Sequence, residues 1–313
     1  MPATSTPGAA LLVAASLCPC FLMTAWASPQ LTGTPTSASL TPIAEPALQG
    51  VTASWVLVNP ANGRSHAGGN ARADEAFPLM SIFKFPLALS VLHRIQQNKL
   101  KLEDTLHVSP DQYDPGSWSP LARRHPQGGT LTVRELLRAA VAESDNNATD
   151  ILLHLIGGPA AVQQDLNSWG QGNIAVAATE REMHADLSKI RLNRASAPDL
   201  ARLLHDFYEG KILRARERAV LWEIMASTET GRNRLAAGLP SGSIFAHKTG
   251  TSDTDSQGRT AALGDIGIAV LPDGQALILV VLMKDIDVPI TRAEACMADV
   301  ARYAVQRMGS APK

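Results

Sequence analysis

Residues 77–92 read FPLMSIFKFPLALSVL, and this stretch carries a single charged side chain, Lys84. It is apolar on nearly every side, which predicts a buried helix at the centre of the fold. Ser81 precedes Lys84 by three positions, so the two side chains share one face of that helix and can touch. Burial lowers the pKa of a lysine unless a carboxylate pairs with it. Such a lysine can take the proton of a serine hydroxyl.

Pro86 conflicts with a regular helix here, because its ring opposes the carbonyl of Ile82 and removes one hydrogen bond. The conflict is smallest in the first turn, so we expect the helix to begin close to Ser81. The Ser81 backbone N–H is then an unpaired donor at the helix N-terminus, which suits an oxyanion. Ser-x-x-Lys alone is a common pattern, and a lysine that extends to solvent along a half-buried helix is the other interpretation.

A second polar stretch, Ser144-Asp145-Asn146, lies between two predicted helices. The first helix begins with the capping-box pattern Thr132-Val-Arg-Glu135, and the second ends at Gly157-Gly158. Taken alone, the stretch reads as a helix-to-helix turn, since serine, aspartate and asparagine favour caps.

A third stretch, His247-Lys248-Thr249-Gly250-Thr251, ends a predicted strand. Thr249 and Thr251 fall on the same side of the strand, and Gly250 allows a ligand to approach the backbone. A lysine with two hydroxyls beside a strand edge makes a site for a carboxylate. An ordinary edge strand guarded by a lysine is the alternative.

Strand patterns gather at the two ends of the chain. Residues 51–69 predict two strands around the turn residues Asn59-Pro60 and Asn62-Gly63, and residues 243–285 predict three antiparallel strands. Residues 291–308 have helical spacing. We therefore expect an α/β lobe from residues 28–79 and 237–313, an inserted all-helical lobe from residues 80–236, and a cleft between them.

Composition narrows the class of partner. The chain has 313 residues, 45% of them hydrophobic, and a formal net charge of -1. There is no basic field of the kind that nucleic acid requires, so we expect a small-molecule partner. The eight histidines lack the paired spacing of a metalloprotease site, and we predict no metal and no cofactor.

Residues 1–27 predict a secretory signal peptide. They contain no Asp, Glu, Lys or Arg, and an apolar run from Ala9 to Met23 precedes Ala25-Trp26-Ala27, a small-x-small cleavage pattern. A buried or membrane-anchoring helix is the alternative, although the run is short for a span and contains Pro19. We expect a secreted or periplasmic monomer without stable membrane association, in which Cys296 is the single remaining cysteine.

Together and in this order, the three stretches resemble the motifs of class A β-lactamases and penicillin-binding proteins over about residues 48–308. The resemblance implies an α/β (α+β) fold with a five-stranded antiparallel sheet, flanking helices and an inserted all-helical lobe. It also implies that Ser81 is the nucleophile and that Lys84 and Glu180 share the base role in acylation, with either of them as the dominant base. Ser144 passes a proton to the lactam nitrogen with electrostatic help from Lys248.

The resemblance also extends to the loop that separates hydrolases from transpeptidases. In class A a loop glutamate activates water, and Glu180 matches it. Residues 179–186 resemble the extended-spectrum branch typified by the PER and VEB enzymes. His184 stands where most class A enzymes have the asparagine that helps to hold this water, and Asp150 replaces an asparagine that contacts the loop.

The remaining predicted site residues are expected to bind substrate. By resemblance, Asn146 binds the acylamide side chain, and Thr249, Thr251 and Arg234 bind the carboxylate. Trp118 resembles the aromatic at the cleft entrance. Ile266 stands where many class A enzymes have an arginine, and Arg234 resembles the alternative arginine of the PER-like branch.

Residues 252–259, SDTDSQGR, make a longer connection than a hairpin needs. We expect them to widen one wall of the cleft, which favours bulky oxyimino-cephalosporins. The alternatives are a D,D-peptidase or small penicillin-binding protein, which would lack the loop glutamate, and a catalytically inactive exported protein that binds cell-wall fragments. The presence of Ser81, Lys84 and Glu180 argues against both.

Overall fold

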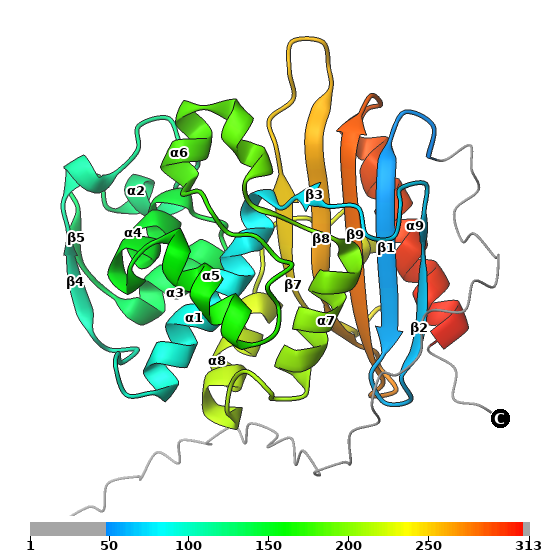
Figure 1. Cartoon of the computed structure of the whole chain (residues 1–313), viewed down its shortest axis with the longest axis horizontal. Helices are drawn as coiled ribbons and strands as arrows, with labels where there is room; N and C mark the ends of the chain where they lie inside the picture. Colours follow the sequence, from blue (N-terminus) through cyan, green and yellow to red (C-terminus); the bar gives the residue numbers. More distant parts are fainter. Residues whose placement is uncertain (1–47, 309–313) are drawn as a thin grey trace, which may run out of the picture. The chain divides into compact units, whose positions relative to one another are not determined.

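The computed structural model describes residues 48–308, so the predicted signal peptide lies outside the described residues. A five-stranded antiparallel sheet, in the order β2-β1-β9-β8-β7, joins strands from both ends of this part of the chain (Figure 1). All five strands predicted from the sequence are present. The strands are β1 (Thr52–Asn59), β2 (Arg64–Gly69), β7 (Ile244–Thr251), β8 (Thr260–Val270) and β9 (Ala276–Ile286).

Both faces of the sheet are buried, each by its own hydrophobic core. Alternate residues of β9 supply the two cores, as the two-residue period of a strand requires. Leu277, Leu279 and Val281 pack toward α9 (Ile290–Met308), whereas Ile278, Val280 and Leu282 belong to the core that includes α1. Burial on both sides explains why β9 is one unbroken apolar run from Ala276 to Met283.

Apart from η5, which packs on α9, the remaining helices lie on the face of the sheet opposite α9 or beyond it (Figure 1). Helix α7 packs directly on β1 and β9, and the short helix η2 packs on β7 and β8. These elements are η2 (Met80–Phe83), α1 (Lys84–Gln96), η3 (Pro110–Gln112), α2 (Pro120–Arg124), α3 (Val133–Val141), α4 (Asn146–Ile156), α5 (Pro159–Ser168), α6 (Glu180–Ala185), η4 (Leu187–Arg191), α7 (Ala197–Tyr208), α8 (Ala215–Ala226) and η5 (Leu235–Gly238).

The segment from residue 80 to 236 is mostly, but not entirely, helical. It contains the antiparallel pair β4 (Thr105–Val108) and β5 (Gly129–Thr132), and β6 (Arg194–Ala195) pairs with β3 (Phe77–Pro78). These strands have two to four residues, too few to give a recognisable alternating pattern. The boundaries proposed above for the two lobes remain a prediction.

The central helix begins where Pro86 predicts it. A 3₁₀ turn, η2, carries Ser81 and leads into α1, so that Pro86 lies in the first turn of α1. Every residue from Lys84 to Leu92 is buried. Two glycines allow η2 to approach the sheet, because a Cβ at Gly264 would lie 2.6 Å from Ile82 Cδ1 and one at Gly250 would collide with Leu79 O.

Gly250 therefore has a packing role, since its missing side chain leaves room for the Leu79 backbone. The approach of a ligand to its backbone remains a prediction.

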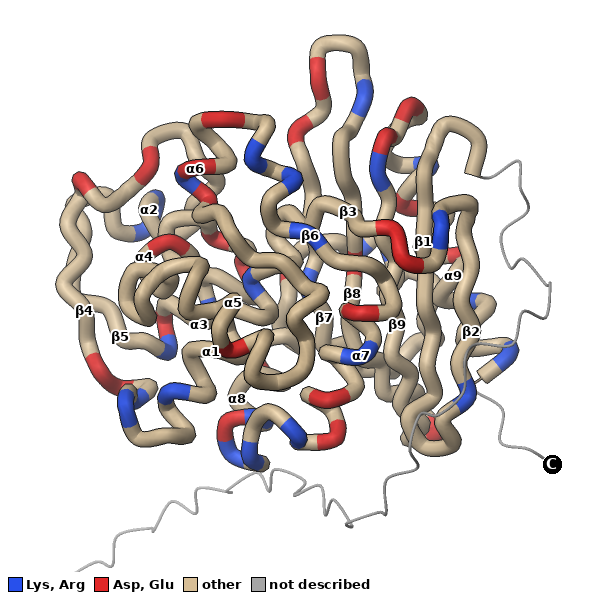
Figure 2. The backbone as a smooth tube through the Cα atoms, in the orientation of Figure 1, with Lys and Arg blue, Asp and Glu red and all other residues tan. Residues whose placement is uncertain are grey.

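Lys and Arg positions are interspersed with Asp and Glu positions along the described part of the chain (Figure 2). No helix within residues 48–308 is long and apolar enough to cross a membrane.

Candidate active site

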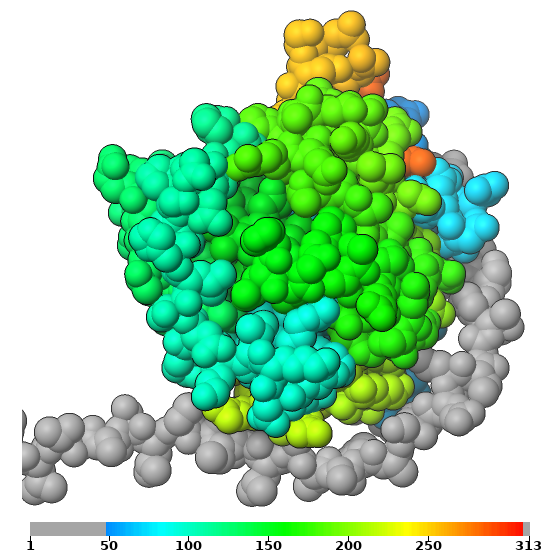
Figure 3. Space-filling model, turned by 60° about the vertical axis from the view of Figure 1, so that its left-hand side comes forward, coloured from blue at the N-terminus to red at the C-terminus, as the bar shows by residue number. Residues whose placement is uncertain are grey.

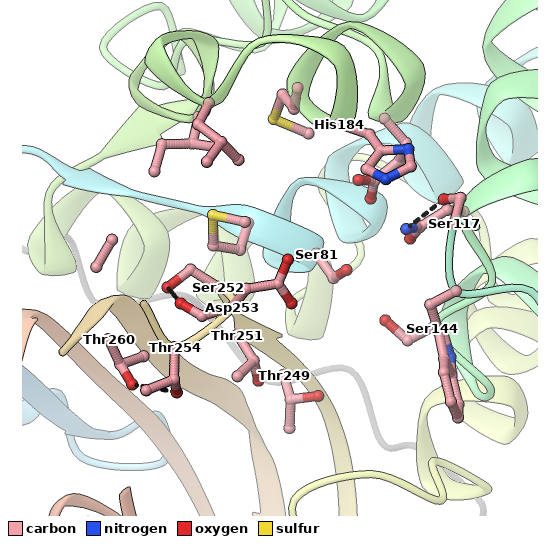
Figure 4. Close-up of a pocket in the computed structure, with 18 of the residues that line it drawn as sticks. Ser81, Ser117, Ser144, His184, Thr249, Thr251, Ser252, Asp253, Thr254 and Thr260 are labelled. Atoms are coloured by element: carbon pink, nitrogen blue, oxygen red, sulfur yellow. Dashed lines mark hydrogen bonds between the residues drawn. The ribbon is translucent and has the colours of Figure 1, made fainter. Parts of the chain in front are cut away.

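A pocket of about 1170 Å³ lies between η2, the loop before α2, helix α6 and strand β7 (Figure 4). Most of the residues predicted from the sequence meet there. Those that line it are Ser81, Trp118, Ser144, Asn146, Glu180, His184, Arg234, Thr249 and Thr251. Lys84 and Lys248 are fully buried behind this lining.

Three groups from other parts of the chain surround the Lys84 ammonium. It donates to the Ser144 carbonyl (2.8 Å) and to Asn146 Oδ1 (2.6 Å), and it lies 3.0 Å from Glu180 Oε1. Glu180 Oε1 is within ion-pair distance but outside hydrogen-bond geometry. Within residues 48–308, the hydrogen bonds of the Lys84 ammonium go to Ser144 and Asn146 and not to the Ser81 hydroxyl.

Ser144 links the two buried lysines. Its φ of +59° is a left-handed conformation that a serine rarely adopts, and it turns the chain sharply between α3 and α4. The Ser144 carbonyl accepts from Lys84, and its hydroxyl accepts from Lys248 (3.0 Å). Asp145 caps α4 by accepting from the Ala148 N–H (2.8 Å), as the sequence pattern predicted.

Lys248 holds its proton less tightly than an ordinary lysine. Burial lowers its pKa well below the usual range, and the positive charge of Lys84 lowers it further, against the opposing effects of Glu180 and Asp265. Besides Ser144, its ammonium contacts the Thr249 carbonyl (2.9 Å). The site therefore contains two buried lysines whose charges are coupled.

Helix α6 begins at Glu180 and is fixed there by two caps. Thr179 and Glu182 form a capping box, and the Asp150 carboxylate accepts from the backbone N–H groups of Glu180 and Arg181, both at 2.8 Å. The expected contact between Asp150 and this loop is therefore present. Burial raises the pKa of Asp150 to about 6.

His184 is one turn beyond Glu180 and lines the pocket. Its side chain is 45% exposed, and its Nδ1 lies 2.7 Å from Asp114 Oδ2. The sequence predicted an imidazole in place of a water-holding amide and gave no reason to expect this partner, which is 70 residues away.

Arg234 is buried and points to the end of β7. It donates to the Gly250 and Gly264 carbonyls (3.1 and 3.0 Å) and to Thr251 Oγ1 (2.7 Å), and its Nε contacts Glu294 (3.1 Å). Arg234 is therefore an internal residue with four polar partners and not an exposed surface arginine.

Trp118 and Ile266 differ sharply in exposure. The Trp118 side chain is 54% exposed at the pocket, with the Arg123 guanidinium 4.7 Å from its ring centroid, so it is not simply packed inside. Ile266 is fully buried on β8 and belongs to the hydrophobic core.

Sequence reasoning missed several polar groups that support this site. Thr230 shares a hydrogen bond with Thr249 (2.6 Å between the hydroxyl oxygens) and lines the pocket. His247 Nδ1 lies 2.8 Å from Asp265 Oδ1, and both side chains are buried in the sheet next to Lys248. Thr230 lies in an irregular segment and has no sequence signal, whereas the alternation of β7 and β8 could have placed His247 and Asp265 on the same face.

This arrangement suits acyl transfer through a serine. It provides a hydroxyl, two buried lysines, a carboxylate and a row of hydroxyl and guanidinium groups that can bind an anion. The described residues contain no group of three or more His, Cys, Asp or Glu side chains that could hold a metal ion.

Comparison with known proteins identifies the family. The sequence model of the β-lactamase enzyme family matches residues 37–308. The chain belongs to the β-lactamase enzyme family. It is 40% identical over 234 residues to the extended-spectrum β-lactamase PER-1 of Pseudomonas aeruginosa. This alignment covers 74% of this chain and 75% of PER-1. It is 38% identical over 231 residues to β-lactamase VEB-1 of the same organism, covering 73% and 77% of the two chains.

A solved β-lactamase structure from Chitinophaga pinensis superposes with a TM-score of 0.79 at 35% identity, covering 82% of this chain and 94% of that one. These relatives and the three ordered motifs place this β-lactamase in class A, and the predicted fold is confirmed.

Proposed function

We propose that this class A enzyme opens the β-lactam ring through an acyl-enzyme on Ser81, with the residue roles given below. The observation that carries this proposal is the environment of Lys84. The Lys84 ammonium is fully buried, and Ser144, Asn146 and Glu180 hold it close to Ser81, which lines the pocket. Such a network can relay the proton of a serine nucleophile.

In acylation, Ser81 Oγ attacks the lactam carbonyl carbon and gives its proton to the relay formed by Lys84 and Glu180, whose Nζ and Oε1 are 3.0 Å apart. The backbone N–H groups of Ser81 and Thr251 hold the oxyanion. The C–N bond then breaks, and Ser144 donates a proton to the leaving nitrogen. Lys248, 3.0 Å from Ser144 Oγ, replaces that proton or stabilises the charge left behind.

Once the proton taken from Ser81 has passed through Lys84 to Ser144, Glu180 is ionised again. In deacylation it removes a proton from a water molecule, the oxygen of which attacks the ester carbonyl; the bond to Ser81 Oγ then breaks and Glu180 returns the proton to Ser81. A D,D-peptidase lacks this step. The presence of Glu180 in the pocket, within 3.0 Å of Lys84, therefore supports a hydrolase over the peptidase and over an inactive binding protein.

Substrate groups have matching partners around the pocket. Thr249, Thr251 and Arg234 would bind the carboxylate, because Arg234 reaches Thr251 Oγ1 at 2.7 Å and brings its charge to the strand edge. Asn146 would bind the acylamide. Trp118 would cover one face of the ligand at the entrance.

Bulky oxyimino-cephalosporins are proposed as substrates alongside penicillins and simpler cephalosporins. The pocket volume of about 1170 Å³ exceeds that of typical small-ligand sites. The β7–β8 loop contributes Ser252, Asp253 and Thr254 to one wall, and Figure 3 shows this segment, in orange, projecting beyond the neighbouring surface. The name of PER-1 describes it as an extended-spectrum enzyme, which supports the same assignment here.

We further propose that the enzyme is exported, on the evidence of the N-terminal signal pattern, and acts as a monomer. Its substrates, small neutral-to-anionic molecules, need neither a membrane surface nor a nucleic-acid groove.

Hydrolysis assays on Ser81→Ala test the proposed function. The variant should lose at least about 10³-fold in kcat against a chromogenic cephalosporin, since removing a covalent nucleophile has effects of that order or larger. Retained turnover would exclude the acyl-enzyme route. In the wild-type enzyme, kcat/KM for a ceftazidime-type substrate should be comparable with that for benzylpenicillin, and negligible oxyimino hydrolysis would exclude the substrate assignment.

A further inference from the structure

Two walls of the pocket face each other near Glu180. The loop of residues 113–118 supplies Gly116, Ser117 and Trp118 to one wall, and α6 supplies Glu180 and His184 to the other. Figure 4 shows His184 beside Ser117, on the opposite side of the pocket from Thr254 and Thr260.

Two hydrogen bonds bridge these walls. His184 Nδ1 and Asp114 Oδ2 are 2.7 Å apart, a distance typical of a charge-assisted bond, and the Arg181 guanidinium donates to the Gln112 carbonyl at 2.8 Å. Both donors belong to α6, and both acceptors belong to the segment before α2. We call the His184–Asp114 contact the clasp.

The Asp114 side of the clasp is fixed to the catalytic centre. The Asp114 N–H donates to Asn147 Oδ1 (2.8 Å). Asn146, the preceding residue of α4, donates to Ser117 Oγ (3.0 Å) and accepts from Lys84. A displacement of Asp114 would therefore also displace the start of α4, which contacts Lys84.

The His184 side of the clasp is fixed to Glu180. The two residues are four positions apart on α6, so their side chains share one face. A helix of only six residues has few internal hydrogen bonds of its own, and its position depends on its end contacts. Asp150 holds the N-terminal end of α6, and the clasp holds the C-terminal end.

We propose that Asp114 and His184 are positioning residues: the clasp holds Glu180 in place for deacylation and limits the room for the acyl side chain of the substrate. This inference rests on the role proposed for Glu180. Without the clasp, α6 can move away from the facing loop. Bulky side chains then enter more easily, while water is activated less efficiently.

The test measures acylation and deacylation separately in Asp114→Ala, His184→Ala and the double variant. Benzylpenicillin represents a small side chain and ceftazidime a bulky one, and mass spectrometry quantifies the acyl-enzyme during turnover. Each single variant should slow deacylation of benzylpenicillin about threefold to tenfold, the range for losing a partly exposed charged contact. The ratio of acylation rate constants, ceftazidime over benzylpenicillin, should rise by a similar factor.

Non-additivity and partial rescue distinguish the clasp from general destabilisation. The double variant should be no slower than either single variant, because the two residues act as a unit. Asp114→Asn, which keeps an acceptor for Nδ1–H, should lose less than Asp114→Ala. Glu103→Ala is the matched control, since it breaks an exposed ion pair with Arg134 (2.9 Å) outside the pocket lining, and both rate constants should stay unchanged.

The proposed role of the clasp would be overturned if the single variants fold, accumulate acyl-enzyme as the wild type does, and keep the same ratio of acylation rate constants. Multiplicative losses in the double variant would overturn it too. Turnover that survives Ser81→Ala would instead overturn the proposed acyl-enzyme mechanism.

Discussion

At the scale of single residues, the isolated charge in the apolar segment 77–92 has a structural explanation. Lys84 is fully buried, and its partners come from two distant segments, around Ser144 and Glu180. A buried charge without such partners would strongly destabilise the fold. The sequence made this lysine conspicuous, and the structure shows how its charge is compensated.

The lowered pKa of Lys248 predicts an alkaline loss of activity. Burial and the charge of Lys84 lower the pKa of Lys248, so it loses its proton at a lower pH than an ordinary lysine. We therefore expect kcat/KM for an anionic β-lactam to fall at a pH below the ordinary lysine range. In Lys248→Arg, whose guanidinium stays charged, the alkaline limb of the residual activity should move to higher pH. A limb at the same pH in both enzymes would show that another group controls it.

The sequence alone identified most residues of the site but not their geometry. Ser81, Lys84, Ser144 and Lys248 stand in short motifs whose order is informative, so they could be named without coordinates. The pairs His184–Asp114 and Thr230–Thr249 could not, because they join residues 70 and 19 positions apart and depend on how the chain folds back.

At the scale of elements, the sequence predicted those helices and strands that have a repeated apolar pattern or a capping motif. The Thr132 capping box and the left-handed Gly157 mark α3 and α4 as predicted. The pairs β3–β6 and β4–β5 escaped prediction because strands of two to four residues depend on their distant partners. The packing of η2 against Gly250 was likewise not predicted, since this close approach is visible only in three dimensions.

Asp150 predicts a pH-dependent contribution to stability at the start of α6. Its folded pKa of about 6 lies above its ordinary value of 3.8, so the folded state binds this proton more tightly than the unfolded chain. Ionisation of Asp150 therefore costs stability as pH rises from about 4 to about 6, by up to about 3 kcal/mol.

Urea unfolding of the wild type and Asp150→Asn between pH 4 and 8 measures the contribution of Asp150 to the unfolding free energy. The unfolding free energy of the wild type minus that of the variant should fall between pH 4 and 6 and stay level above. A difference that rises with pH would contradict the assignment.

At the scale of the whole molecule, the described chain positions its site by folding back on itself. The sheet contains strands from both ends of residues 48–308, and η2 carries Ser81 against β7 and β8. Residues from η2, α4, α6 and β7 meet at one pocket. The two-ended strand pattern predicted this topology, whereas the width of the pocket depends on loops that have no periodic signal.

The β7–β8 loop allows a test of pocket width. Asp255 orders the loop by accepting from the Gln257 and Arg259 N–H groups, both at 2.9 Å, so the turn is held by its own contacts. Replacing residues 253–258 by a two-residue turn should lower kcat/KM for ceftazidime about tenfold, as expected for roughly 1.4 kcal/mol of lost transition-state contact, and change benzylpenicillin less than about threefold. Equal losses for both substrates would indicate general damage to β7 and not a change in selectivity.

The most direct test of the mechanism is the fate of the acyl-enzyme in Glu180→Gln. The amide keeps the size of the side chain but cannot accept a proton from water. Intact-protein mass spectrometry after addition of benzylpenicillin should show the enzyme increased by the mass of one substrate, with the added mass located on the peptide that contains Ser81, and steady-state turnover should be almost abolished. A variant that turns over at the wild-type rate, or an adduct on any other residue, would contradict the account.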